Sequence, residues 1–145
     1  MIEKVQESHL YMWLKEKDSK FLSKLYEVIE YANTMLPQIN NVFASYTVHG
    51  VKHSINVMEY MYSLIVDINK LSELEVALLI YSALLHDIGM VANEEEIKEI
   101  KNDRAILGER KYSKVLEKYG DETTALQECI RPVHGKRARD YIEKR

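Results

Sequence analysis

Three residues have the types and the spacing that could hold a metal ion: His53 and the adjacent pair His86–Asp87. The pair follows a nearly continuous apolar run, Val76 to Leu85, which predicts a buried helix. An imidazole and a carboxylate at the end of such a helix are costly unless they are paired or bound. Both side chains can reach one ion at the helix end. A solvent-exposed polar pair at an ordinary helix end explains the spacing equally well.

His53 lies among apolar residues at helical spacing, which predicts that its side chain faces inward. A lone inward histidine is more often a core residue than a ligand. Together with His86 and Asp87, however, it forms a mixed nitrogen and oxygen set. Such a set suits Fe, Mn, Zn or Co and leaves coordination positions for water and substrate. The predicted stripe comprises Val57, Met61, Leu64 and Ile68.

His49 precedes His53 by four residues and is a second candidate ligand. On a continuous helix this spacing would aim both imidazoles at one ion. Gly50 lies between them and makes a continuous helix less certain, so a loop histidine at a helix start is an equal alternative.

His134 lies between Pro132 and Gly135, which predicts a turn with the histidine at the start of a helix. A helix start surrounded by cations suits phosphate. The alternative is a solvated basic face. The cations of this region are Arg131, Lys136, Arg137 and Arg139.

The length of the chain, 145 residues, fits one domain covering residues 1–145. Its 20 Lys and Arg against 23 Asp and Glu give a net charge of −3, which argues against a protein that coats nucleic acid. The N-terminus has no apolar signal core, and the longest apolar run is half the length that spans a bilayer. The one cysteine, Cys129, is predicted to be half-buried and unreactive. We therefore expect a cytoplasmic protein without a membrane segment.

The predicted fold is all-α, because glycine and proline are few and the alternation typical of strands is missing. Ser72 with Glu75 predicts a capping box. A loop is expected from Gln38 to His49, and Glu94–Glu96 are expected on a solvated helix face. The expected helices are Ile2 to Lys15, Asp18 or Ser19 to Leu36, Gly50 to Ile68, Ser72 to Gly89, Glu94 to Tyr119 with a break at Gly108, Asp121 or Thr123 to just before Pro132, and Gly135 onward.

Two segments, YTVHGVKHSINV (46–57) and LLHDIGM (84–90), together resemble the HD domain superfamily of metal-dependent phosphohydrolases. The resemblance implies a compact multi-helix HD-domain bundle with one or two divalent transition-metal ions. The opening helices, which contain Trp13, look more narrowly like the HD domain upstream of a histidine-kinase-like ATPase module.

The resemblance also implies residue roles. His53 matches the family's first histidine, and His86 and Asp87 match its doublet, all three as metal ligands. In the two-metal branch, His49 and His134 match further ligands. The family's final aspartate has no convincing match here, which favours an N-terminal fragment, or a short member, that lacks the last ligand-bearing helix. The missing GYP block argues against a cyclic-di-nucleotide phosphodiesterase.

The leading hypothesis from the sequence is hydrolysis of a phosphate ester, with a nucleotide as the expected substrate, by metal-activated water. Asp87 would ligate the ion and accept the water proton. Lys52, Arg131 and Lys136 would hold phosphate oxygens. The alternative is a non-catalytic regulatory module that binds metal or nucleotide and signals to a C-terminal partner domain. A homodimer is a further expectation, and a purely structural bundle would instead leave His53, His86 and Asp87 apart.

Overall fold

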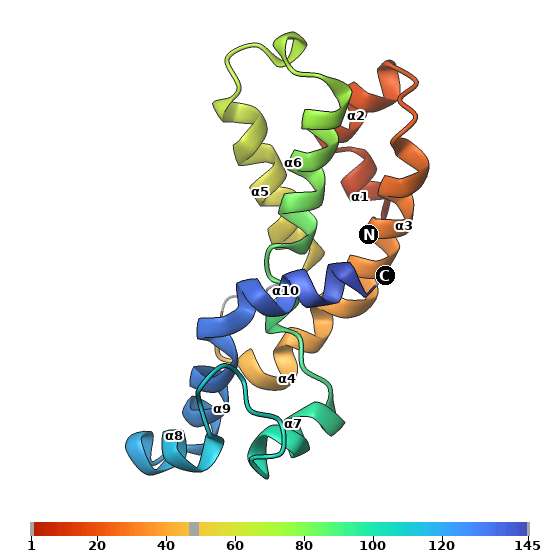
Figure 1. The fold of residues 1–145 in the computed structure, drawn as a ribbon. Coiled ribbons are helices and arrows are strands. Elements are labelled where there is room, and N and C mark those ends of the chain that lie inside the picture. The colour runs from red at the N-terminus through yellow and green to blue at the C-terminus, as the bar shows by residue number, and fades with distance from the viewer. Residues whose placement is uncertain (1, 47–49, 145) are drawn as a thin grey trace. The chain divides into compact units, whose positions relative to one another are not determined.

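Helices form every regular element of the computed structural model, which describes residues 2–46 and 50–144 (Figure 1). Within these ranges there is no β-strand, and one isolated antiparallel bridge joins Leu107 and Arg110. The all-α prediction is therefore confirmed. The chain forms two compact units. The first unit comprises residues 1–37 and 49–86, and the second comprises residues 38–48 and 87–145.

The first unit is built around one apolar helix, α6 (Glu73–Leu85), which packs against α2, α3 and α5. Five of its residues are buried and form a continuous core face, as the apolar run predicts: Val76, Ala77, Ile80, Ala83 and Leu84. The other elements of this unit are α1 (Ile2–Gln6), α2 (His9–Glu16), α3 (Leu22–Met35), α5 (Val51–Leu64) and the 3-10 turn η2 (Ile68–Lys70).

The start of α6 is fixed by the predicted capping box. The Ser72 hydroxyl accepts the Glu75 backbone N–H at 3.3 Å, and the Glu75 carboxylate accepts the Ser72 backbone N–H at 2.8 Å. The predicted end at Gly89 is wrong, because the helix ends at Leu85 and His86 caps it. Gly89 lies in a separate 3-10 turn, η3 (Ile88–Met90).

The second unit joins short helices that are distant in sequence. Helix α8 packs beside α9, and α10 packs on the turn η3. The Gln127 side chain of α9 donates to the Val42 carbonyl of α4 at 2.9 Å and ties these two helices together. Its elements are α4 (Asn40–Phe43), η3 (Ile88–Met90), α7 (Glu94–Lys101), α8 (Tyr112–Tyr119), α9 (Glu122–Ile130), η4 (Arg131–Val133) and α10 (His134–Glu143); the turn η1 (Leu36–Ile39) precedes α4.

Local hydrogen bonds correct the predicted boundaries in the N-terminal part of the chain. The first predicted helix is broken at Ser8, whose hydroxyl donates to the Val5 carbonyl at 2.7 Å while its backbone is extended. Asp18 does not cap a helix but has a left-handed backbone with φ 49°. Helix α3 instead begins at Leu22. The predicted loop after Gln38 contains the helical turns η1 and α4.

Helix α5 also differs from its prediction, in length and in orientation. It ends at Leu64 rather than Ile68, because the backbone of Ile65 turns to an extended conformation. The predicted apolar stripe is wrong at Leu64, which is 82% exposed, whereas its other members are half-buried. The fully buried residues of α5 are Val51, Ser54 and Met58. His53 adjoins this buried face and is half-buried.

The helix boundaries in the C-terminal part of the chain agree better with those predicted from the sequence. Asp121 caps α9 through a 2.7 Å hydrogen bond from the Thr124 backbone N–H, and the helix ends before Pro132. The break predicted at Gly108 exists but extends over residues 102–111. Within the described ranges, no single helix is long and apolar enough to cross a membrane, and one bent pair meets that test only jointly, by length and composition.

Candidate metal centre

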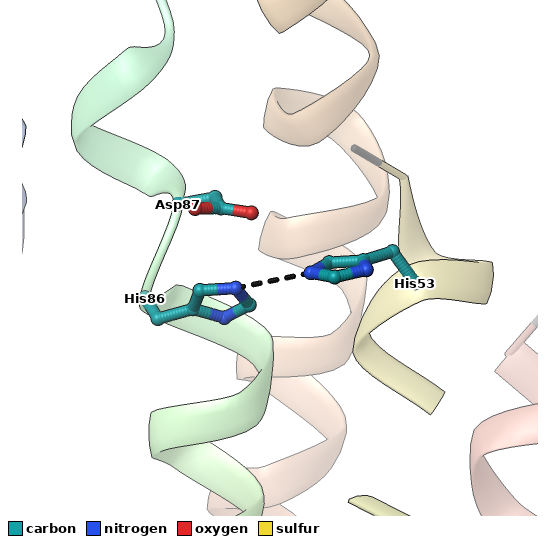
Figure 2. Close-up of side chains that lie close together, drawn as sticks. All are labelled: His53, His86 and Asp87. Carbon is teal, nitrogen blue, oxygen red and sulfur yellow. Dashed lines mark hydrogen bonds between the residues drawn. The ribbon is translucent and has the colours of Figure 1, made fainter. Parts of the chain in front are cut away.

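His53 lies in one helix and His86 directly follows another, and their Nε2 atoms point at each other. The two atoms are 3.2 Å apart (Figure 2). His53 lies in the first turns of α5, and His86 directly follows α6. Because α5 packs against α6 within the first unit, helix packing brings the two imidazoles together.

The other ring nitrogen of His86 is also engaged. Its Nδ1 lies 3.1 Å from the carbonyl oxygen of Ala83, one turn earlier in the chain. A carbonyl oxygen only accepts hydrogen bonds, so Nδ1 carries the proton of this contact, and in the neutral ring the lone pair of Nε2 faces His53. Metal-binding histidines are oriented in this way by a hydrogen bond from the second nitrogen.

Asp87 supplies a carboxylate beside the imidazole pair. It directly follows His86 in the chain and is 8% exposed. One ligand atom from each of His53, His86 and Asp87 lies within 4.8 Å of the others. Two nitrogens bound to one tetrahedral ion at about 2.0–2.1 Å would be roughly 3.3 Å apart. The donor types and spacing therefore fit a metal ion, and this cluster could bind one.

A family model described as HD-CE matches residues 43–145. The chain belongs to the HD-CE family. This match confirms the resemblance to HD-type domains and includes all three residues of the cluster, whereas α1, α2 and α3 lie outside it. No curated protein and no solved structure was found to match the HD-CE chain.

The second-rank ligands are less well defined by the structure. His49 lies outside the described residues. His134 is the first residue of α10, as the prediction of a helix start requires, and its Nδ1 is 2.6 Å from the Arg131 carbonyl. This contact orients the His134 ring, as the contact with the Ala83 carbonyl orients the ring of His86. A ligand role for either residue stays a prediction.

The predicted phosphate-binding cations are exposed. Lys52 neighbours His53 on α5, and Lys136 lies in the first turn of α10. Arg131 is half-exposed and its guanidinium bonds the Glu128 carboxylate at 2.8 Å. All three side chains are accessible to a ligand from solution, but the guanidinium of Arg131 is already paired with the Glu128 carboxylate.

Arg137 is the residue that sequence reasoning misassigned. It was expected among the cations of a basic face, but its side chain is 9% exposed. It binds the Glu96 carboxylate at 2.6 Å, so the expectation of a solvated face for Glu94–Glu96 fails at Glu96. The neighbouring Ala138 is also buried, so this face of α10 is covered.

Cys129 is fully buried rather than half-buried. Burial raises the pKa of its thiol, which disfavours the reactive thiolate. The structure thus gives the cysteine no chemical role at the site and makes it a packing residue of α9.

Proposed function

We propose that the HD-CE chain is a metal-dependent phosphohydrolase acting on a phosphate ester, with nucleotides as the substrate class. The observation that carries the proposal is the cluster of His53, His86 and Asp87 in a chain of HD type. Two imidazoles and a carboxylate form a mixed nitrogen and oxygen donor set, which suits a transition-metal ion and leaves coordination positions for water and substrate.

Each residue of the cluster has a distinct part. His53 and His86 offer Nε2 donors, and the Ala83 carbonyl holds the His86 ring in the tautomer that binds a cation. Asp87 offers the negative charge and a site that can hold a proton. A divalent ion bound there would lower the pKa of water and polarise a phosphoryl oxygen.

Local cations must attract the substrate, because the net charge of −3 does not. Lys52 is one residue from His53 and its ammonium is exposed, so it is the first candidate to bind phosphate oxygens. Arg131 and Lys136 are the further candidates. A reducing cytoplasm fits a chain whose single thiol is free, and we place the protein there.

Metal analysis of protein purified without chelator tests the proposal first. We expect stoichiometric transition metal, and its loss in His53→Ala, His86→Ala and Asp87→Ala. The control is His9→Ala, because His9 is an exposed histidine of α2 that pairs with Glu59. Wild-type protein without metal, or His86→Ala with a full complement, would contradict the metal centre.

Hydrolysis of a panel of nucleotides and cyclic nucleotides tests the catalysis separately. The three ligand variants should each lose more activity than the roughly 10–100-fold typical of residues that only orient a ligand. His9→Ala should retain full activity. Stoichiometric metal with binding but no turnover of every substrate would contradict the enzyme and favour the regulatory module.

A further inference from the structure

We infer that Arg137 is a positioning residue of the metal centre, acting through the backbone that follows Asp87. The inference rests on the proposed function, since it assigns Asp87 a ligand role. It concerns the second unit, which contains both Asp87 and Arg137.

Arg137 spans the turn η3 with one buried guanidinium. Its Nε donates to the Gly89 carbonyl at 2.7 Å, and its Nη2 donates to the Val91 carbonyl at 2.6 Å. Two carbonyls on either side of Met90 are thereby held by a single planar group. Charge-assisted bonds of this length are the strong class of hydrogen bond.

The same guanidinium is anchored at its other side. Its Nη1 and Nη2 bind the two oxygens of Glu96 at 2.6 and 3.2 Å. The buried positive charge is therefore neutralised by a carboxylate of α7. We call this set of contacts, from Arg137 to Gly89, Val91 and Glu96, the arginine latch.

Gly89 allows the backbone of the turn η3 to approach the backbone of α10 closely. A Cβ at this position would lie 1.8 Å from the His134 carbonyl oxygen and 2.7 Å from the Ala138 backbone nitrogen. The two backbones are thus in direct contact, and only glycine allows it. The turn cannot shift relative to α10 without breaking either this contact or the arginine latch.

Asp87 is two residues from Gly89, and its carbonyl accepts the Met90 backbone N–H at 2.9 Å. The turn η3 that the latch holds therefore begins directly after Asp87 and is hydrogen-bonded to it. The imidazoles have other supports, since His53 and His86 are set by the packing of α5 and α6. The latch should therefore act on the carboxylate ligand.

The matched variants are Arg137→Lys and Arg139→Lys. Lysine keeps a positive charge beside Glu96, but one ammonium cannot make the fork of bonds to both carbonyls. Arg139 is on the same helix and its side chain is 64% exposed, so Arg139→Lys controls for the exchange of a guanidinium for an ammonium group on α10. The probe is Co²⁺ alone, measured by calorimetry and by its visible absorption spectrum.

We expect Arg137→Lys to weaken Co²⁺ binding about tenfold and to change the spectrum, while Arg139→Lys does neither. In an Asp87→Ala background, Arg137→Lys should have no further effect, because residues that act through one another are not additive. Amide hydrogen exchange of Met90 and Val91 in metal-free protein should be faster in Arg137→Lys than in wild type.

The possible failures are distinct. Wild-type protein that binds no Co²⁺ overturns the proposed function, and the positioning role with it. Wild type that binds Co²⁺ no better than Arg137→Lys overturns the positioning role alone, as does an equal loss in the Asp87→Ala background. If Arg137→Lys does not fold, Glu96→Gln removes the anchor charge and must show the same affinity loss.

Discussion

His86 and Asp87 are bonded neighbours, yet the elements beside them are held by different forces. His86 caps α6, whose Ile80 and Leu84 are completely buried in the first unit. Asp87 opens the turn η3, which the second unit holds through the buried guanidinium of Arg137. Apolar packing is non-directional and distributed over many atoms, whereas the latch concentrates its effect in a few short hydrogen bonds.

This difference has a consequence for how each region fails. A truncated apolar side chain leaves a cavity whose cost depends on how far the surroundings relax. A polar latch that loses one member leaves the other buried groups without partners, which costs their full desolvation. The support of Asp87 should therefore be more sensitive to single changes than the support of His86.

The chain contains a reporter for each region. Trp13, the one tryptophan, lies on α2 in the first unit, so its fluorescence follows that unit. Cys129, the one cysteine, is fully buried on α9 in the second unit. Because burial raises the pKa of its thiol, labelling of Cys129 should be slow until the second unit opens.

The largest effect is expected for Gly89→Ala. The added Cβ would overlap the His134 carbonyl oxygen, so the turn η3 and α10 must separate. We expect the free energy of unfolding to fall by at least about 4 kcal/mol, a size that is seen for severe steric or buried-polar defects. Labelling of Cys129 by a thiol reagent in native buffer should accelerate accordingly.

The control for Gly89→Ala is Gly135→Ala on the same helix that η3 contacts. A Cβ at Gly135 meets nothing within 4 Å. Because alanine is a better helix former than glycine, the free energy of unfolding of this variant should rise by about 0.5–1 kcal/mol. Equal labelling rates in the two variants would mean that the close approach of η3 to α10 is not needed for stability.

The next effect is expected for Ile80→Ala in the core of α6. Ile80 is fully buried, so its truncation should lower the free energy of unfolding by about 2–5 kcal/mol. Urea unfolding followed by Trp13 fluorescence measures it. Leu78→Ala on the exposed side of α6, where Leu78 is 51% exposed, should cost much less. Similar losses in both would contradict the buried face assigned to α6.

The same contrast explains what could be predicted from the sequence. Helix α6 was predictable, because its apolar run and its capping residues are local signals that agree with each other. Its end was not, since Gly89 is the usual sign of a helix stop but serves here to admit α10. The stripe predicted for α5 was wrong at Leu64, which remains exposed although it is apolar and at helical spacing.

The site was predictable to a similar extent. The residue types and spacing of His53, His86 and Asp87 pointed to one cluster, and the structure brings their ligand atoms together. Arg137 was not predictable as a buried residue, because a single arginine among other cations reads as part of a basic surface. Its partners, Gly89, Val91 and Glu96, are more than forty residues away in the chain, and only the fold brings them within reach.

A smaller effect is expected for Ser72→Ala, which removes the cap of α6 in the first unit. The loss of the hydrogen bond to the Glu75 backbone should cost about 1 kcal/mol. Urea unfolding followed by Trp13 fluorescence measures it. Ser82→Ala, at an exposed position within the same helix, is the control and should be neutral or slightly stabilising. A neutral Ser72→Ala would show that packing alone fixes the start of α6.

The smallest effect is expected from titration of the cap of α9 in the second unit. The Thr124 backbone N–H donates to the Asp121 carboxylate and lowers the pKa of that group below its ordinary 3.8. The folded state thus favours the charged form, and its contribution to stability is present above the unfolded pKa. This contribution is lost as the pH falls below about 4 and through the folded pKa.

Asp121→Asn isolates that titration, because asparagine caps a helix about as well as aspartate but does not ionise. Unfolding by urea, followed by circular dichroism between about pH 5 and pH 2, should show a weaker loss of stability in Asp121→Asn than in wild type. Glu109→Gln, at an exposed position in the segment before α8, controls for the removal of one carboxylate. A pH profile of Asp121→Asn that coincides with wild type would mean that the cap of α9 is held by the neutral hydrogen bond alone. The second unit would then depend on charge at the arginine latch but not at this helix start.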